Sequence, residues 1–172
     1  MIREIVVYPD KRLRKISEDV ENFDANLHKL LDDMYETMIA QAGVGLAAIQ
    51  VSIPSNILII CLPNEEDVQG KEDLIEAINP VVTHKDGELV FTEGCLSVPG
   101  FTEDVTRAQH IVVEYFNRDG EKQTMEAEGF LAVAWQHEME HLEGHLFIEH
   151  LSFLKRKKFE KEWKKRLKEQ KK

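Results

Sequence analysis

The sequence predicts an α+β fold, because strand-like patterns gather in the middle of the chain and helical patterns lie towards its two ends. The chain has 172 residues, of which 42% are hydrophobic and 31% are charged. This length and composition are typical of a globular protein with a substantial core and exclude the disordered and fibrous classes. We expect one domain over residues 1–172, in which residues 152–172 form a basic C-terminal helix.

The N-terminal region should contain a short strand at Ile5–Tyr8 and a helix over residues 25–41. Asp24 supplies a side-chain oxygen that can cap the first turn of this helix. Gly43 follows the helix, as glycine often does where a helix ends. One face of the helix should meet the core, since its apolar residues recur at helical spacing, namely Leu27, Leu30, Leu31, Met34 and Met38.

The middle of the chain should form strands at residues 57–62, 77–83, 88–91, 110–116 and 122–127. Cys61 belongs to the first of these apolar runs and is interpreted as a small core residue. Residues 64–72 are polar and charged, which predicts a loop. The turn sequence Asn117-Arg-Asp-Gly120 separates the last two strands, so these strands are expected to pair as a hairpin.

Two further helices are expected near the C-terminus. One covers residues 129–142 and ends near Gly144. The other is capped by Ser152 and continues into the basic tail. In this tail Phe159, Trp163 and Leu167 are spaced by four residues, which predicts a narrow apolar stripe along one face of the helix.

The charge of the chain is distributed unevenly. The net charge is −10, yet residues 155–172 hold 11 Lys and Arg against 3 Asp and Glu. Such a basic segment is either a solvated helix or a contact for an anionic partner. No apolar run approaches the roughly 20 residues that cross a bilayer, and the N-terminus lacks the zones of a secretory signal. We therefore expect a cytoplasmic protein with no membrane partner.

The sequence His137-Glu-Met-Glu-His141 carries the clearest chemical signal. Residues four apart lie on one face of a helix, so His137 and His141 can bind one metal ion. Glu138 lies about 100° around the helix, where it can reach a metal-activated water as a general base. A solvated helix with scattered histidines is the alternative, but the preceding apolar residues predict a partly buried site.

A helical pair of histidines needs a third protein ligand. In zinc peptidases with this motif the third ligand lies C-terminal to it, and His145 and His150 are available there. These two do not complete the usual extension of that motif. Cys95, in the glycine-containing sequence Glu93-Gly-Cys-Leu-Ser97, is the better candidate, because a thiolate binds a borderline metal strongly.

Three separated segments resemble the signature motifs of the peptide deformylase family, in the bacterial type 1-like form with a C-terminal helix. They are Gly43-Val-Gly-Leu-Ala-Ala-Ile-Gln50, Glu93-Gly-Cys-Leu-Ser97 and Gln136-His-Glu-Met-Glu-His-Leu142. Their order and separation also fit the family. The resemblance implies antiparallel or mixed sheets around a central helix that carries the H-E-x-x-H sequence. It also implies hydrolytic removal of the N-formyl group from the initiator methionine of nascent polypeptides, with release of formate.

The resemblance further implies a role for each matching residue. Cys95, His137 and His141 would hold one divalent metal, natively Fe²⁺, which Zn²⁺, Ni²⁺ or Co²⁺ can replace. Glu138 would be the general base and then the acid, while the Gln50 amide and the Leu96 backbone N–H would stabilise the oxyanion. The substrate would contact a larger set of residues, namely Val44, Gly45, Leu131, Ala134 and Trp135.

Two residues depart from the family pattern. Glu140 stands where the family has Asp, which would pair with Arg107 outside the metal ligands, so we expect this pair to persist with adjusted geometry. Trp135 is unusually large for a position that lines the methionine pocket. It either reshapes this pocket or packs into the core, and the sequence leaves both interpretations open.

Other partners and functions follow from the same features. The basic C-terminal helix resembles the segment with which some bacterial deformylases dock on the ribosome near the tunnel exit, whereas no feature favours DNA. A zinc peptidase that cuts internal peptide bonds is one alternative, and Cys95 argues against it. A non-catalytic ribosome- or RNA-binding protein is another, suggested only by Glu140 and Trp135.

Overall fold

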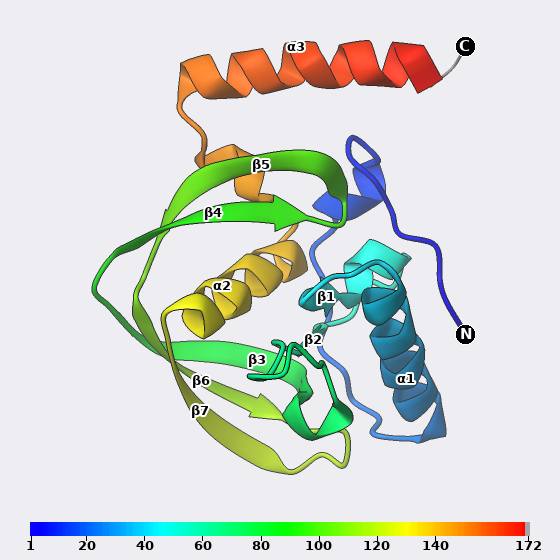
Figure 1. Ribbon diagram of the computed structural model, residues 1–172. Helices are drawn as coiled ribbons and strands as arrows, with labels where there is room; N and C mark the ends of the chain where they lie inside the picture. The colour runs from blue at the N-terminus through cyan, green and yellow to red at the C-terminus, as the bar shows by residue number, and fades with distance from the viewer. Residues whose placement is uncertain (171–172) are drawn as a thin grey trace.

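The computed structural model describes residues 1–170 and has an α+β architecture in which a central helix, α2, lies between two antiparallel sheets, while two further helices cover the outer sides of these sheets (Figure 1). The helices are α1 (Ala25–Ala40), α2 (Phe130–Leu142) and α3 (Phe153–Gln170). The strands are β1 (Gly45–Ala47), β2 (Ile57–Ile60), β3 (Ile75–Asp86), β4 (Leu89–Cys95), β5 (Val98–Arg107), β6 (His110–Phe116) and β7 (Lys122–Glu128). No helix in this part of the chain combines the length and apolar character needed to cross a bilayer.

The larger sheet has five strands in the order β1-β2-β3-β6-β7, and each neighbouring pair is antiparallel. Strands β6 and β7 form the expected hairpin, in which Asn117 accepts from the backbone N–H of Gly120 across the turn. Gly120 has φ of 78°, a conformation that glycine adopts without strain. The turn therefore fixes the register of this pair.

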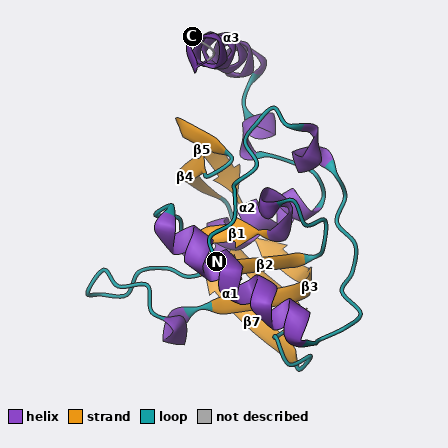
Figure 2. Cartoon of the chain, turned by 90° about the vertical axis from the view of Figure 1, so that its right-hand side faces the viewer, coloured by secondary structure: helices purple, strands orange, loops and turns teal. Residues whose placement is uncertain are grey.

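Helices cover both faces of this sheet, with α1 on one face and α2 on the other (Figure 2). Strand β2 shows the consequence, because Leu58 and Ile60 pack in the cluster that includes α2, whereas Ile57, Ile59 and Cys61 pack with α1. A strand buried on both faces needs apolar residues throughout, which explains the continuous apolar run at this point of the sequence.

Strands β4 and β5 form the second sheet, which lies on the opposite side of α2 from the five-stranded sheet (Figure 1). Helix α3 packs outside this hairpin through Phe159 and Trp163, which are buried with Val105 of β5. Trp163 also donates from Nε1 to the backbone oxygen of Tyr8 over 3.0 Å. The apolar stripe predicted in the basic tail is thus the face that anchors α3.

Several expected elements are confirmed. Asp24 caps α1 through a hydrogen bond from Leu27 N–H, and Ser152 accepts from Lys155 N–H at the start of α3. The left-handed residue after α1 is Ala42, with φ of 56°, while Gly43 closes the last turn by donating to Met38. The predicted basic tail extends to residue 172, and its last two residues lie outside the described part of the chain.

Other expectations about elements were wrong or incomplete. Residues 5–8 do not form a strand, because Val6 N–H donates to Gln50 and Tyr8 N–H donates to Ser97, so the segment bridges two regions without joining a sheet. Strands β1 and β5 were not predicted. Strand β5 has few apolar residues and includes the polar run Thr102-Glu-Asp104, so it lacks the apolar alternation of a half-buried strand, and β1 has only three residues.

Candidate active site

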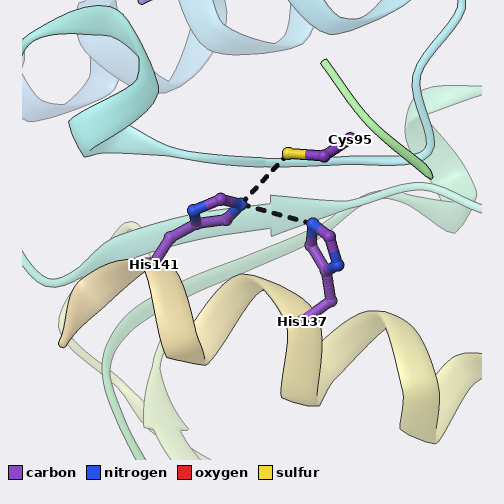
Figure 3. Close-up of side chains that lie close together, drawn as sticks. All are labelled: Cys95, His137 and His141. Carbon is purple, nitrogen blue, oxygen red and sulfur yellow. Dashed lines mark hydrogen bonds between the residues drawn. The ribbon is translucent and has the colours of Figure 1, made fainter. Parts of the chain in front are cut away.

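Cys95, His137 and His141 meet at the centre of the molecule (Figure 3). His141 Nε2 lies 3.4 Å from the sulfur of Cys95 and 3.3 Å from Nε2 of His137. Donor atoms on a tetrahedral metal with bonds of 2.0–2.3 Å are separated by about 3.3–3.6 Å. Two nitrogens and one sulfur at these distances therefore fit one divalent metal with an open fourth position.

The local folding of the chain explains how these three side chains converge. His137 and His141 are one turn apart on α2, and their ring centroids lie 5.0 Å apart. Cys95 is the last residue of β4, where the β4–β5 register shifts between Gly94 and Cys95. Burial lowers the pKa of His141 well below its usual value, so its ring is neutral, as a metal ligand must be.

Glu93 contacts Nδ1 of His137, whereas the other ring nitrogen, Nε2, faces the candidate metal position. Its carboxylate accepts from Nδ1 of His137 over 2.8 Å and from two nitrogens of Arg107 over 2.8 and 2.9 Å. Burial alone would raise the pKa of Glu93, but these hydrogen bonds outweigh it and lower the pKa to about 2. The ionised carboxylate fixes the ring orientation and tautomer of His137.

Arg107 also contacts Glu140, as the family resemblance implied for this pair. The longer side chain of Glu140 reaches a second partner, because its Oε2 lies 2.7 Å from Nε2 of His150. His150 therefore pairs with Glu140, and Nδ1 of His145 lies 3.2 Å from Oε1 of Glu149. Neither of these downstream histidines lies with Cys95, His137 and His141, which we call the Cys95 group. The arrangement expected of a zinc peptidase, with a third ligand C-terminal to the motif, is therefore excluded for His145 and His150.

Glu138 is buried beside the three candidate ligands. One of its carboxylate oxygens lies 3.9 Å from His137 Nε2, and Oε2 has no hydrogen-bond partner among residues 1–170. Burial raises the pKa of Glu138 to about 7. A carboxyl group in this state is suited to accept a proton and release it again. A β-carbon at residue 45 would lie 2.9 Å from Glu138 Oε1, so any larger residue there would displace the Glu138 side chain.

Gln50 has a fixed orientation next to the sulfur of Cys95. Its Oε1 accepts from the backbone N–H of Ala47 over 2.9 Å, so its Nε2 must face the other way. Nε2 donates to Ser97 Oγ over 3.0 Å and lies 3.6 Å from the Cys95 sulfur. Leu96 follows Cys95 in the β4–β5 turn, and it lines the same cavity as Gln50 and Cys95.

A cavity of about 510 Å³ opens onto this centre. Among the predicted substrate contacts, Val44, Gly45 and Ala134 line it together with Gln50, Cys95, Leu96, His137 and Glu138. Leu131 and Trp135 do not line it. Trp135 is fully buried on the other side of α2, where its ring centroid lies 5.3 Å from that of Tyr115. The prediction that Trp135 lines the pocket was therefore wrong, and its alternative, core packing, holds.

Sequence reasoning missed some of the residues around this cavity. Phe91 and Phe130 line it and stack with ring centroids 4.8 Å apart, although they come from β4 and from the start of α2. Val133 lines it as well. Nothing in the spacing of these residues indicates that they meet. Glu93 stands inside a recognised motif, so its acidic side chain could have been assigned to His137.

The comparisons with known proteins agree with this geometry. The family model described as polypeptide deformylase matches residues 2–157. The chain is 56% identical to the peptide deformylase of Nautilia profundicola over 171 residues, covering 99% of this chain and 98% of that protein. It is 58% identical to the peptide deformylase of Campylobacter jejuni over 173 residues, covering 100% of this chain and 99% of that protein.

Solved structures show the same likeness. The crystal structure of a peptide deformylase from Legionella pneumophila is similar to this chain with a TM-score of 0.88 and 40% identity, covering 98% of both chains. A peptide deformylase from Ehrlichia chaffeensis in complex with actinonin is similar with a TM-score of 0.87 and 40% identity, covering 96% of this chain and 97% of that chain.

Proposed function

Because the chain belongs to the peptide deformylase family, we propose how its own residues carry out the reaction of that family. The protein is a hydrolase that removes the N-formyl group from nascent polypeptides. The family implies a divalent metal, and the observation that supports the proposal is the convergence of Cys95, His137 and His141 beside the buried carboxyl group of Glu138.

Cys95, His137 and His141 are the ligands that would hold the metal in this proposal. One thiolate and two imidazoles form a donor set for borderline metals, and their spacing fits a single ion. We assign Fe²⁺ as the native ion and expect Zn²⁺, Ni²⁺ or Co²⁺ to substitute. When bound, the metal supplies Lewis acidity and lowers the pKa of water towards about 7.

Glu138 moves the protons of the reaction. Its carboxylate takes a proton from the water as the water oxygen bonds to the formyl carbon. It then gives this proton to the amino nitrogen as the carbon–nitrogen bond breaks, so that formate and a free N-terminal amine leave. Two features of Glu138 support this role: its Oε2 has no hydrogen-bond partner among residues 1–170, and its side chain is buried. A buried carboxylate exchanges the proton with the substrate rather than with bulk solvent.

Gln50 and Leu96 stabilise the charge that develops on the formyl oxygen. The Gln50 amide is oriented before the substrate arrives, because Ala47 and Ser97 fix its two ends. The backbone N–H of Leu96 is the second donor. Preoriented donors of this kind each contribute about 2.7–4 kcal/mol to lowering the barrier.

The cavity next to Glu138 would receive the methionine side chain and the peptide that follows it. Val44, Gly45 and Ala134 line this cavity, and the apolar residues Val133 and Phe130 complete part of its wall. A thioether side chain is suited to such an apolar surface. Formyl-methionyl nascent peptides are therefore the substrates that we assign to the cavity.

The function is tested by measuring formate release from formyl-Met-Ala-Ser with protein purified without oxygen, together with the metal content of the same sample. The parent should bind one metal per chain and release formate. Cys95→Ser should lose most of both, because a hydroxyl group is a much poorer ligand than a thiolate. Cys61→Ser, a change to the other cysteine in the core, is the matched control and should keep both. Equal activity in Cys95→Ser and the parent would refute the ligand assignment.

Glu140 is expected to act through Arg107, and thereby through Glu93. We propose that Glu140→Asp keeps or raises the rate of formate release, since the shorter carboxylate can still pair with Arg107 while losing His150. A large fall in the rate would contradict this, and would assign a role to the contact with His150.

The basic face of α3 is proposed to dock on the ribosome near the tunnel exit, which would place the protein in the cytoplasm beside its substrates. Its lysines are exposed, including Lys157, Lys161, Lys164 and Lys168. Truncation would also remove the buried anchors of α3, so charge reversal of these four lysines is the cleaner test. Affinity for ribosomes and its salt dependence should fall sharply, whereas reversal of four exposed lysines elsewhere, Lys11, Lys15, Lys71 and Lys85, should have a smaller effect. Equal effects of both sets would contradict the proposal.

A further inference from the structure

A second group of metal-ligating side chains lies on the five-stranded sheet, formed by His84 and Asp86 of β3 and His110 of β6. One donor atom from each residue lies within 4.8 Å of the other two. His84 Nε2 lies 2.5 Å and His110 Nδ1 lies 2.8 Å from the same carboxylate oxygen of Asp86. This group shares no residue with the cavity over the catalytic centre or with the Cys95 group.

The strand pairing places the three side chains on one face of the sheet. Asp86 is the direct partner of His110 in the antiparallel β3–β6 pair. His84 and Asp86 are two residues apart, so their side chains leave the strand on the same side. The register of β3 shifts between Val82 and His84, just before the group. The two histidine rings consequently meet edge to face, with centroids 5.7 Å apart.

Glu126 of β7 determines which nitrogen of His110 is free to bind a cation. Its Oε1 lies 2.7 Å from Nε2 of His110, so in the neutral ring Nε2 carries the proton and donates it to Glu126. The lone pair of Nδ1 then points at the Asp86 carboxylate, which is also an acceptor. The hydrogen bonds to Asp86 and Glu126 raise the pKa of His110, so without a metal a proton on Nδ1 joins these two acceptors, and a metal ion would take the place of that proton. A carboxylate behind the ring of a histidine ligand is the usual support of a metal site.

We propose that His84, Asp86 and His110 bind a divalent transition-metal ion of the Zn²⁺ class, with Glu126 as a positioning residue. Two imidazoles and one carboxylate suit Zn²⁺, and water completes a tetrahedral set. Donor atoms on such an ion are about 3.3 Å apart, so the Asp86 oxygen must move away from both rings by less than about 1 Å, and the two ring nitrogens, which lie within 4.8 Å of each other, must take up the same spacing. Asp86 and His84 are exposed and have room to do so. The bound ion joins β3 to β6.

The test counts the zinc that binds beyond the first equivalent. Protein loaded with one Zn²⁺ per chain is dialysed against increasing Zn²⁺ at pH 7.5, and the bound zinc and formate release are both measured. The parent should take up a second equivalent without loss of activity. His110→Ala and His84→Ala should each weaken this second binding at least tenfold while keeping the first equivalent. Glu126→Gln should weaken it by roughly 10- to 100-fold without changing the stoichiometry at saturation.

His145→Ala is the matched control, because His145 is as exposed as His84 and also lies beside a carboxylate, that of Glu149. It should bind both equivalents as the parent does. A parent that takes up no second zinc would overturn the proposal and leave a proton on His110 as the cation. Equal second-site affinity in the parent and His110→Ala would also overturn it. Failure of the assignment of Cys95 as a metal ligand would give a different result, because the first equivalent of zinc would then be missing.

Discussion

Two glycines allow the backbone to approach the side chains of Leu96 and Glu138 closely. A β-carbon at residue 43 would lie 2.8 Å from Leu96 Cδ1, and one at residue 45 would lie 2.9 Å from Glu138 Oε1. Distances under 3.0 Å require something to move. The glycine at residue 43 therefore leaves room for the Leu96 side chain, and the glycine at residue 45 leaves room for the carboxylate of Glu138, the proposed base.

Gly45→Ala should lower kcat for formate release by roughly 10- to 100-fold, because Glu138 must move by a sizeable fraction of an ångström. Metal content should stay at the parent value, since residue 45 contacts no metal ligand that we assign. Gly70→Ala is a fair control, because a β-carbon there meets only the flexible end of Glu72. A variant at residue 45 with the parent rate would show that the position of Glu138 does not limit catalysis.

Glu93→Gln should weaken metal binding by roughly 10- to 100-fold, since it removes the negative charge that supports His137. The measurement is a competition titration of the metal-free protein with a chelator of known affinity. Glu103→Gln, on β5, is the control, because among residues 1–170 this carboxylate accepts from Lys155 and Asp104 at the surface. An unchanged affinity in Glu93→Gln would mean that the ring of His137 is held by its packing alone.

Trp135→Ile should leave substrate preference unchanged and lower the free energy of unfolding by about 2 kcal/mol. The indole fills core space beside Tyr115, but its Nε1 has no hydrogen-bond partner within residues 1–170, which makes its loss milder than that of most buried tryptophans. Denaturant unfolding and kinetics on formyl-Met and formyl-norleucine peptides measure both effects. A changed ratio between the two substrates would restore the pocket interpretation.

The grouping of Cys95, His137 and His141 could be predicted from the sequence because their residue types are those of metal ligands. Cys95, His137 and Glu138 stand in motifs whose spacing suits the roles that we propose for them. The residues that line the walls of the cavity could not be predicted from the sequence. Phe91 and Phe130, for example, meet only after β4 folds over α2. The location of Trp135 could not be predicted for the same reason. The position of a residue along a helix does not reveal which other elements pack against its side chain.

Helix α3 owes its place to two aromatic side chains in an otherwise charged sequence. Phe159 and Trp163 are buried against Tyr8 and the β5 side of the small sheet. Their spacing by four residues made this stripe predictable. Strand β5 was not predictable in the same way, because it lies between β4 and α3 with an exposed, charged edge and shows no apolar alternation.

Trp163→Ala should lower the free energy of unfolding by about 3–5 kcal/mol, since it removes a buried ring and the hydrogen bond to Tyr8. Phe153→Ala, in the same helix, removes a ring that is 79% exposed and should change stability by less than about 0.5 kcal/mol. Urea unfolding of both variants gives the comparison. Similar losses in the two would mean that α3 is not anchored through its aromatic stripe.

The whole molecule is arranged so that α2 lies between two sheets of different kinds. The five-stranded sheet supplies Gly45 from β1 next to Glu138, and the β4–β5 hairpin brings Cys95 and Glu93 to the histidines. Residues 45, 95 and 137 are far apart in the sequence, so the metal position exists only in the folded chain. The α+β class followed from the order of strand and helix patterns, whereas this enclosure depends on long-range pairing that no local pattern encodes.

Formate release by Glu138→Gln, compared with the parent at equal metal content, tests the account most directly. The substitution would keep the shape of the side chain and remove its ability to accept a proton. We expect the metal to stay bound and the rate to fall by at least about 10²-fold, because no other carboxylate of the described chain lines the catalytic cavity except Glu93, which is held by Arg107 and His137. A metal-loaded Glu138→Gln protein that releases formate at the parent rate would contradict the assignment of Glu138 as the base.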